Sequence, residues 1–265
     1  MSTEGSGASR GAGDGIHNED AFLVQDELGL YLVCDGASQS AAGEVAARIA
    51  RDAVAATIQA AETDLDVQGR GARALVEEAM AQATRAVAAA ARTDPELRDS
   101  ATTMTVLLAH GRLGVIGHCG DSRAYLLRRG RSQQLTVDHE LAERVPSEST
   151  QAGAFDVFSV ELRGGDTVVL CTDGAEKVVE DDTISQVAAG LSPRLLSSRI
   201  VSAARRRDPC MDATAVVVRV CAEREAGWFE LSELPQPTAF GHTLRRPVPP
   251  PAPRKSERSR RPRPR

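Results

Sequence analysis

Residues 21–60 read AFLVQDELGLYLVCDGASQSAAGEVAARIARDAVAATIQA, and this stretch decides the fold class. Two short apolar runs, at 21–25 and 30–34, are separated by Asp26-Glu27-Leu28-Gly29, which is the pattern of a β-hairpin. From residue 41 to about residue 60, apolar side chains recur near helical spacing on good helix formers. The stretch therefore predicts two paired strands followed at once by a long amphipathic helix.

The rest of the chain continues this mixture of strands and helices. We expect a second helix at 71–91, strands at 102–109, 113–118 and 122–127, a hairpin of 156–162 with 167–172 around Gly164-Gly165, helices at 174–189 and 193–206, and a last strand at 213–220. This order excludes a regular βαβ alternation. It predicts an α+β fold, a four-layer αββα sandwich of two antiparallel β-sheets flanked by helices.

The two ends of the chain differ from its centre in composition. Residues 1–8 open a Gly- and Ser-rich stretch that we expect to be flexible, and 9–222 form the predicted domain. Residues 223–234 are an acidic-aromatic segment that we expect at the periphery. Residues 235–265 are rich in Pro and Arg and cannot bury enough apolar surface to fold, so they predict a disordered basic tail.

Composition restricts the class of protein. Hydrophobic residues make up 42% of the chain and aromatic residues 3%, so Ala, Val and Leu must fill one large core. The net charge of −5 combines an acidic body with the basic tail, but no groove-reading motif accompanies the basic residues and we do not expect nucleic-acid binding. No apolar run approaches ~18 residues and no leader pattern opens the chain, so we expect a cytoplasmic protein without a membrane span. We also expect a monomer.

The five cysteines argue against disulfides and against zinc. They stand at 34, 119, 171, 210 and 221, an odd number without Cys-x-x-Cys spacing. Three of them lie in apolar runs, where a thiol behaves as a small core residue.

Acidic residues stand at four expected strand ends, each beside a turn. They are Asn18-Glu19-Asp20, Asp35-Gly36, Asp173-Gly174 and Asp212. Hard cations such as Mg²⁺ and Mn²⁺ prefer carboxylate, carbonyl and water oxygens, and a glycine after the aspartate lets the backbone carbonyl approach a metal. A single Asp-Gly is more often only a turn. Four such sites at sheet ends make coincidence a weaker explanation, although spacing alone does not identify the chemistry.

The motifs resemble those of the bacterial metal-dependent protein phosphatases of the PPM (type-2C) family, in family order over residues 9–221. The opening carries Asn18-Glu19-Asp20-Ala21, Leu32-Val33-Cys34-Asp35-Gly36 and Ala42-Gly43-Glu44-Val45-Ala46. The middle carries Ala101-Thr102-Thr103, Gly120-Asp121-Ser122-Arg123-Ala124-Tyr125-Leu126 and Gln134-Leu135-Thr136-Val137-Asp138-His139, and the end carries Leu170-Cys171-Thr172-Asp173-Gly174 and Met211-Asp212-Ala213-Thr214. Together these motifs are highly specific, and each alone is weak.

The resemblance implies a role for each matching residue. Asp35 resembles the aspartate that bridges two metals, and the carbonyl of Gly36 would serve the second metal. Asp173 and Asp212 match ligands of the first metal. Glu19 and Asp20 match the acidic pair that binds the metals or hydrogen-bonds their waters, which makes Asp20 and Asp35 the expected catalytic residues. Asp121 matches an aspartate linked to a third, weaker metal; the other interpretation is a turn aspartate in the Gly-Asp-Ser-Arg bend.

The resemblance implies a Mn²⁺- or Mg²⁺-dependent serine/threonine protein phosphatase with phosphoprotein substrates and a Ser/Thr kinase, or its targets, as partners. Two cations would lower the pKa of a shared water and clamp the phosphoryl oxygens, so no protein nucleophile is needed. The alternative is a phosphatase-like regulatory or binding module with weak or no catalysis. No Asp-x-Asp-x-Thr and no Gly-x-x-x-x-Gly-Lys-[Ser/Thr] occurs, which disfavours a haloacid-dehalogenase-type hydrolase and an NTPase.

The chain departs from the family where the substrate would be held. Gly15 stands where the family usually has a phosphate-binding arginine, and Arg10 is the nearest replacement. No histidine acid follows Asp35-Gly36, which leaves His17, His118 and His139 as alternatives for a proton donor. The segment between His139 and Asp166 is shorter than the family's flap normally needs. These changes predict poor grip on a phosphopeptide and better relative handling of a small phosphoester.

Overall fold

The computed structural model describes residues 1–13, 17–37, 42–61, 70–139, 145–146, 155–180 and 182–222. Gly15, most of the shortened flap segment, and the predicted segments 223–234 and 235–265 lie outside the described residues. Residues Met1–Arg224 form one compact unit.

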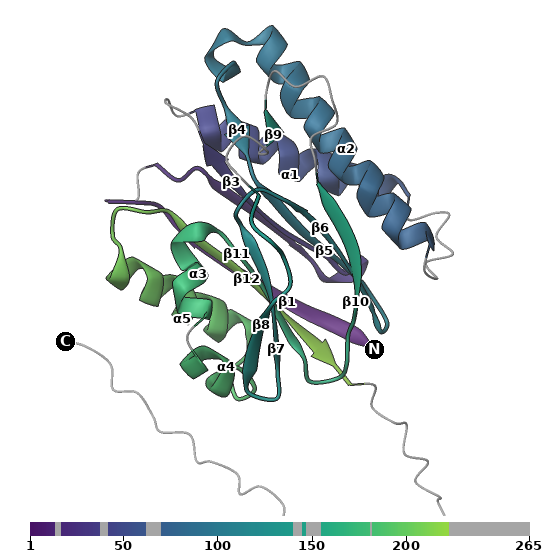
Figure 1. Ribbon diagram of the computed structural model, residues 1–265, viewed down its shortest axis with the longest axis vertical. Helices are drawn as coiled ribbons and strands as arrows, with labels where there is room; N and C mark the ends of the chain where they lie inside the picture. Colours follow the sequence, from purple (N-terminus) through teal and green to yellow (C-terminus); the bar gives the residue numbers. More distant parts are fainter. Residues whose placement is uncertain are drawn as a thin grey trace, which may run out of the picture. The chain divides into compact units, whose positions relative to one another are not determined.

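Two antiparallel sheets form the centre of this unit (Figure 1). The first sheet, in the order β1-β12-β11-β7-β8, consists of β1 (Ser2–Arg10), β12 (Ala213–Cys221), β11 (Thr167–Cys171), β7 (Arg123–Arg128) and β8 (Arg131–Gln134). The second, in the order β10-β6-β5-β3-β4-β9, consists of β10 (Asp156–Glu161), β6 (Leu113–Cys119), β5 (Met104–His110), β3 (Leu30–Ala37), β4 (Ala101–Thr102) and β9 (Val145–Pro146). Strand β2 (Asp20–Gln25) pairs with β3 and completes the predicted hairpin.

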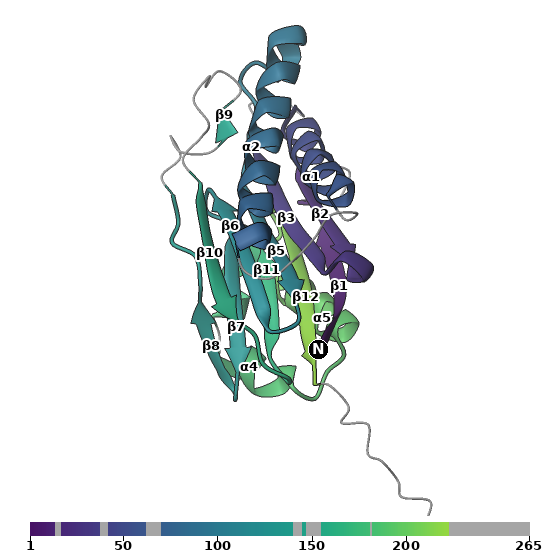
Figure 2. The same cartoon turned by 90° about the vertical axis from the view of Figure 1, so that its right-hand side faces the viewer.

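Helices cover the outer face of each sheet. Figure 1 shows α1 (Ala42–Ala60) and α2 (Arg70–Thr93) on one side of the two sheets, and α3 (Asp173–Val179), α4 (Asp182–Ala188) and α5 (Pro193–Arg207) on the other. Helix α2 lies over β6 and β5 (Figure 2). The predicted four-layer αββα sandwich is therefore confirmed. Within the described residues, every helix is too short or too polar to cross a bilayer.

The central strands are apolar throughout because their side chains point alternately to two buried faces of the sheet. In β3, Tyr31 and Val33 pack in the core between the sheets, whereas Leu30, Leu32 and Cys34 face the core beneath α1 and α2. Successive side chains of a strand point to opposite faces, so a strand buried on both sides needs apolar residues throughout. All five cysteines are free thiols, and Cys34, Cys119 and Cys171 are buried as expected.

The expected flexibility of residues 1–8 is wrong. They belong to β1, which pairs with β12 from Ser2↔Cys221 to Arg10↔Ala213. Glycine makes this strand possible, because a Cβ on Gly5 would lie 2.4 Å from the Tyr31 ring and one on Gly7 would lie 2.2 Å from the Phe22 ring. The Gly-rich composition therefore lets the backbone approach aromatic rings closely.

The expected hairpin of 156–162 with 167–172 is also wrong. Strand β10 pairs with β6 in one sheet, while β11 pairs with β7 and β12 in the other. The connection crosses between the sheets, and the buried Asp166 holds it by accepting two hydrogen bonds from Arg128. The single helix expected at 174–189 is two, since α3 ends at Val179 and α4 begins at Asp182.

Candidate functional site

Asp20 and Asp35 lie opposite each other on two neighbouring strands. They are Cα partners at one end of the β2–β3 pair. Asp35 continues the alternation of Tyr31 and Val33, so both aspartates occupy the face of their sheet that looks toward the other sheet. The hairpin thus places two of the predicted site residues side by side.

Two hydrogen bonds join this end of the hairpin to the opposite sheet. Thr172 Oγ1, directly after β11, donates to Asp20 Oδ2 at 2.9 Å. The backbone N–H of Glu19 donates to Asp212 Oδ2 at 2.7 Å, just before β12 begins. The sequence therefore brings together, at one end of the sandwich, residues that are up to 193 positions apart.

Glycines let the acidic segments pack against one another. A Cβ on Gly43, at the start of α1, would lie 2.7 Å from Glu19 Oε2 and 2.9 Å from the Gly36 carbonyl carbon. The Glu19 carboxylate therefore lies close to the backbone of Gly36 in β3. A Cβ on Gly174 would lie 1.9 Å from the Asp212 carbonyl oxygen, which shows how closely the start of α3 approaches the loop before β12.

The pKa of the Asp20 carboxylate is shifted strongly by its surroundings. Burial raises its pKa from 3.8 to about 7, hydrogen bonds from Thr214 and Thr172 oppose the shift, and the negative charges of Asp212 and Asp173 add to it. Its Oδ1 atom is buried, and no residue in the described part of the chain donates a hydrogen bond to it. A buried carboxylate oxygen without a donor, among other carboxylates, fits the chemistry of a hard-cation site.

The side chains do not form a closed metal cage as they stand. Among the described residues, no three His, Cys, Asp or Glu side chains are grouped closely enough to hold an ion. Both carboxylate oxygens of Asp212 accept backbone hydrogen bonds, from Ala12 at 2.6 Å and from Glu19 at 2.7 Å. The donor set fits a divalent cation by its chemistry, and the buried oxygen of Asp20 is the observation that supports this fit.

Asp121 lies in the turn between β6 and β7, and a hydrogen-bonded chain connects this turn to Asp35. Ser122 Oγ lies 2.6 Å from Thr103 Oγ1, which in turn accepts the backbone N–H of Asp35 at 2.9 Å. Gly120, with φ +102°, permits the turn. The role of Asp121 at a third metal stays a prediction.

Two of the three candidate histidines have structural contacts at both ring nitrogens. His118 is buried, with Nδ1 3.1 Å from Thr105 Oγ1 and Nε2 3.0 Å from the Val137 carbonyl. Burial, followed by the charge of His139, lowers the pKa of His118 to about 4. His139 contacts the Gly120 N–H through Nδ1 and Asp156 through Nε2. These rings hold segments together, and His17, which is exposed, remains the candidate proton donor.

Several contacts at the site were missed by sequence reasoning. Thr172 and Thr103 contact Asp20 and Asp35, yet a threonine beside an aspartate gives no signal of a cross-sheet contact. Arg205 of α5 donates to the carbonyl of Gly13 at 2.8 Å and also to that of Pro209, so it ties the loop after β1 to the loop that carries Asp212. Arg205 stands in a run of three arginines that resembled a solvated helix end.

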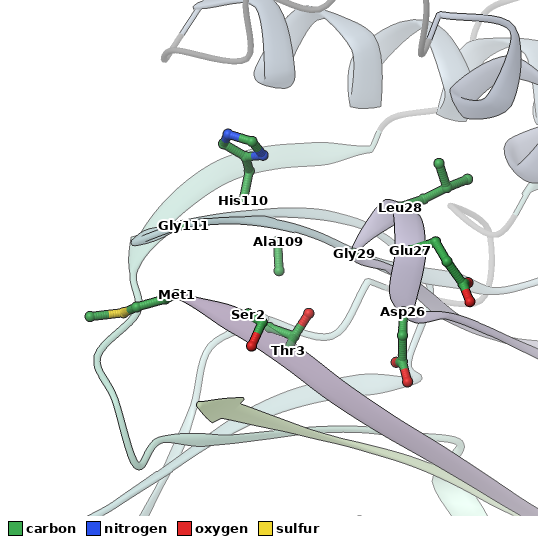
Figure 3. Close-up of a pocket in the computed structure, with 10 residues that line it drawn as sticks. All are labelled: Met1, Ser2, Thr3, Asp26, Glu27, Leu28, Gly29, Ala109, His110 and Gly111. Atoms are coloured by element: carbon green, nitrogen blue, oxygen red, sulfur yellow. The ribbon is translucent and has the colours of Figure 1, made fainter. Parts of the chain in front are cut away.

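A pocket of about 390 Å³ lies near the ends of β2 and β5 that are distant from Asp20 and Asp35. Figure 3 shows the residues that line it. It is lined by Met1–Thr3, Asp26–Gly29 and Ala109–Gly111. These residues belong to or directly adjoin the start of β1, the short 3₁₀ helix Asp26–Leu28 and the end of β5, and the acidic side chains among them, Asp26 and Glu27, are exposed. Asp26 Oδ1 already accepts hydrogen bonds from Gly5 N and from Tyr31 Oη. This pocket has no feature of a catalytic site.

Comparison with known proteins gives a family match. The family model described as protein phosphatase 2C matches residues 7–205. The serine/threonine protein phosphatase PstP of Mycobacterium tuberculosis is 31% identical over 226 residues, which cover 77% of this chain and 42% of PstP. The serine/threonine phosphatase stp of Listeria monocytogenes is 24% identical over 208 residues, which cover 69% of this chain and 81% of that protein. This chain therefore spans less than half the length of PstP.

Solved structures agree with the match. The catalytic domain of PstP in complex with 2 manganese ions superimposes with a TM-score of 0.72 at 26% identity, covering 83% of this chain and 99% of that one. A second PstP structure gives a TM-score of 0.73 at 24% identity over 84% of this chain and 100% of that one, which supports the fold.

Proposed function

The chain belongs to the protein phosphatase 2C family, and from this premise we propose that it hydrolyses phosphoserine and phosphothreonine in proteins with the aid of divalent cations. The observation that carries the proposal is the pairing of Asp20 with Asp35 at one end of β2 and β3, with a buried Asp20 oxygen that lacks a donor among the described residues. Buried acids without a cation are costly, so a fold that gathers them supports a site that binds one.

The resemblance to the family implies which residues would hold two ions. Glu19, Asp35 and the Gly36 carbonyl would hold one ion, and Asp35, Asp173 and Asp212 the other. Oxygen donors alone favour Mn²⁺ or Mg²⁺ over Zn²⁺, and the PstP structure with 2 manganese ions supports the same choice. A third ion at Asp121 is part of the proposal. When bound, such ions supply a water of lowered pKa and positive charge for the phosphoryl oxygens.

Side chains of this protein would accept the proton of the attacking water and exclude other water from the site. Oδ2 of Asp20 accepts a hydrogen bond from Thr172, whereas Oδ1 has no donor among the described residues and would accept a proton from the attacking water. The apolar core between the sheets, including Val33, closes the site from beneath and limits water access. The proton donor for the leaving group stays open, with His17 as the candidate among the three histidines.

The grip on substrate is proposed to be weak. Gly15 lacks the guanidinium fork that would bind phosphate bidentately, and Arg10, at the end of β1, is exposed. We therefore expect a high KM for phosphopeptides relative to a small aryl phosphate. The kinase partner, the monomeric state and the cytoplasmic location stay predictions from the sequence.

One observation favours the alternative, a phosphatase-like binding or regulatory module. Both oxygens of Asp212 accept backbone N–H groups, and no three candidate ligands of the described residues are grouped as a cage. A protein that uses this fold only to bind a partner does not need metal ligands with free oxygens, so it would tolerate these hydrogen bonds to Asp212.

The test is turnover on p-nitrophenyl phosphate and on a phosphothreonine peptide, with wild type, Asp35→Asn and Asp52→Asn. Asp52 is an acid of α1 whose side chain is 67% exposed, so its variant controls for loss of one negative charge. We expect Asp35→Asn to lower kcat by orders of magnitude with an unchanged circular dichroism spectrum, and Asp52→Asn to behave as wild type. An Asp35→Asn variant as active as wild type would favour the binding module.

A further inference from the structure

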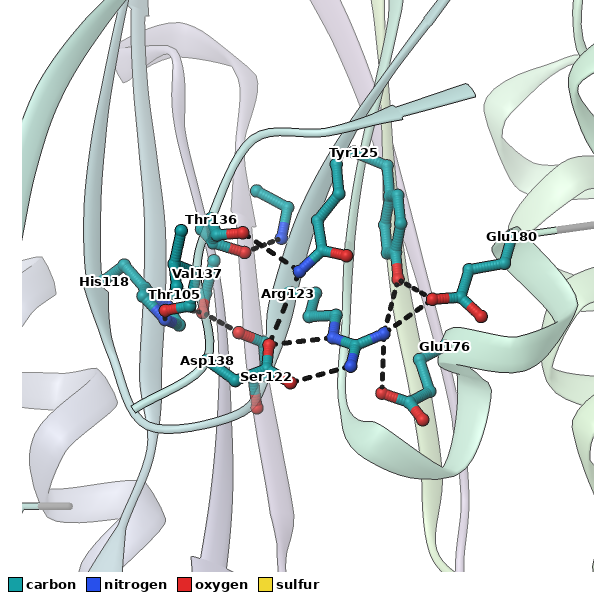
Figure 4. A network of polar contacts seen from close by, with 12 residues as sticks. Thr105, His118, Ser122, Arg123, Tyr125, Thr136, Val137, Asp138, Glu176 and Glu180 are labelled. Atoms are coloured by element: carbon teal, nitrogen blue, oxygen red, sulfur yellow. Dashed lines mark hydrogen bonds and ion pairs between the residues drawn. The ribbon is translucent and has the colours of Figure 1, made fainter. Parts of the chain in front are cut away.

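Arg123, at the start of β7, holds three carboxylates with one guanidinium group (Figure 4). Its Nε and Nη2 donate to the two oxygens of Asp138 at 2.8 and 2.7 Å. Its Nη1 lies 2.7 Å from Glu180 Oε1 and 3.0 Å from Glu176 Oε2. The side chain of Arg123 is only 17% exposed, so these ion pairs are screened less than those of the surface.

The three carboxylates belong to two segments that are distant in the chain. Asp138 lies in the stretch 135–139 that follows β8, whereas Glu176 stands in the first turn of α3 and Glu180 is its C-cap. The hydrogen bonds with Asp138 raise the pKa of Arg123, so the guanidinium stays charged. One rigid, planar fork thus joins β7, the 135–139 stretch and α3.

Each of the two segments held by Arg123 is connected to a different predicted metal ligand, Asp121 or Asp173. The 135–139 stretch is fixed to the Asp121 turn, because His139 N donates to the Gly120 carbonyl at 2.8 Å and His118 Nε2 contacts the Val137 carbonyl at 3.0 Å. Helix α3 begins at Asp173 itself. Arg123 therefore stands between the turn that carries Asp121 and the helix that carries Asp173.

We propose that Arg123 is a positioning residue: it fastens α3 to the 135–139 stretch and so sets Asp173 relative to Gly120-Asp121. The proposal deepens the proposed function and rests on it where metal binding is concerned. The carboxylates that Arg123 holds are those of Asp138, Glu176 and Glu180, so it acts through these three residues. Groups that orient metal ligands from outside typically change metal affinity by 10–100-fold when they are lost.

The same strand supplies a matched control. Arg128, at the other end of β7, donates through Nε and Nη2 to the two oxygens of the buried Asp166 at 2.8 and 2.6 Å. Each arginine therefore binds its own aspartate through two parallel hydrogen bonds. Arg128, however, holds the connection that crosses between the sheets, at the end of β7 that is distant from the Asp121 turn. Arg→Lys at either position keeps the positive charge and loses the bidentate fork.

Two measurements on Arg123→Lys and Arg128→Lys test the proposal: Mn²⁺ titration by calorimetry, and amide hydrogen exchange of the metal-free full chain. For Arg123→Lys we expect Mn²⁺ affinity about tenfold weaker and faster exchange confined to 135–139 and 173–180. For Arg128→Lys we expect faster exchange near 128–134 and 163–166, with unchanged Mn²⁺ affinity.

The outcomes separate this proposal from the proposed function. If wild type binds Mn²⁺ and both variants lose stability but keep wild-type affinity, Arg123 is only structural and the proposal is overturned. Equal loss of affinity in both variants would also overturn it, because a general loosening of β7 would then explain the effect. If wild type binds no Mn²⁺, the proposed function fails. The exchange pattern then still decides whether Arg123 couples 135–139 to α3.

Discussion

Asp20 carries a negative charge whose burial is costly for the metal-free protein. Its pKa is about 7 in the folded chain, against 3.8 ordinarily. Between these values the folded state binds a proton that the unfolded state has released. The free energy of unfolding therefore falls as the pH rises from about 4 to about 7, by up to about 4 kcal/mol, and stays low above that range. The stabilising state is the protonated acid.

Asp20→Asn should remove this pH dependence. In chelator-treated protein we expect the variant to exceed wild type in free energy of unfolding at pH 8, and the difference to shrink toward pH 5, because an amide carries no charge to bury. Urea unfolding at both pH values measures it, with Asp52→Asn as the exposed control. A wild-type-minus-variant difference that is the same at pH 5 and pH 8 contradicts the assigned burial of Asp20.

Gly43 is the residue where helix propensity and the site make opposite demands. Alanine in a helix is favoured over glycine by about 1 kcal/mol. A Cβ at position 43, however, would lie 2.7 Å from Glu19 Oε2 and 2.9 Å from the Gly36 carbonyl carbon. Either the Glu19 carboxylate or the Gly36 backbone must move.

We therefore expect Gly43→Ala to weaken Mn²⁺ binding by about tenfold, in the range for groups that orient ligands, whatever its effect on thermal stability. Gly71→Ala is the matched helical control, because Gly71 is exposed in α2. Calorimetric titration of both variants with Mn²⁺ is the measurement. Wild-type affinity in Gly43→Ala would show that Glu19 does not hold the ion.

Single residues of the site could be singled out from the sequence only where an acid follows an apolar run. Asp35 and Asp173 each follow an apolar run and precede a glycine, and this pattern is local. Thr172 could not be found, because its bond to Asp20 joins two sheets. Arg123 was visible as part of a motif, but its partners Asp138 and Glu176 meet only through tertiary packing.

At the scale of elements, the composition of β1 gave a wrong prediction, because the packing of this segment determines its structure. A Gly- and Ser-rich segment suggests flexibility, yet β1 pairs along its whole length with β12. Its glycines pass over aromatic rings, and such close approach cannot be recognised without knowing that Tyr31 and Phe22 lie beneath. The crossing from β10 to β11 was misread for a similar reason, since Gly164-Gly165 suits a hairpin as well as a change of sheet.

Gly7→Ala should test the docking of β1. Its Cβ would lie 2.2 Å from the Phe22 ring, and overpacking of this kind typically costs about 1–3 kcal/mol. Ser6→Ala is the control on the other face of the strand, where we expect a change within about 0.5 kcal/mol. Urea unfolding of both variants gives the two values. Equal stabilities of Gly7→Ala and wild type would mean that β1 does not lie over Phe22.

At the scale of the whole molecule, the order of helices and strands along the chain was sufficient to predict the layered architecture. Strands, a helix pair, more strands, helices and a final strand leave few arrangements besides two antiparallel sheets covered by helices. The order of strands within each sheet was not predictable, because β1 and β12 come from opposite ends of the described chain. That pairing also brings the residues after β1 next to Asp212, because the backbone N–H of Ala12 donates to the Asp212 carboxylate just before β12.

The site is thus a property of the assembled sandwich: β2 and β3 supply Asp20 and Asp35, and the opposite sheet supplies Thr172 and Asp212. The central claim is that these acids serve a divalent cation in phosphoester hydrolysis. The most direct measurement is the initial rate on a phosphothreonine peptide after exhaustive chelation, before and after Mn²⁺ is restored, with bound metal determined by elemental analysis. We predict no detectable rate without metal and recovery with Mn²⁺. Full activity of a chain shown to be free of metal would contradict the account.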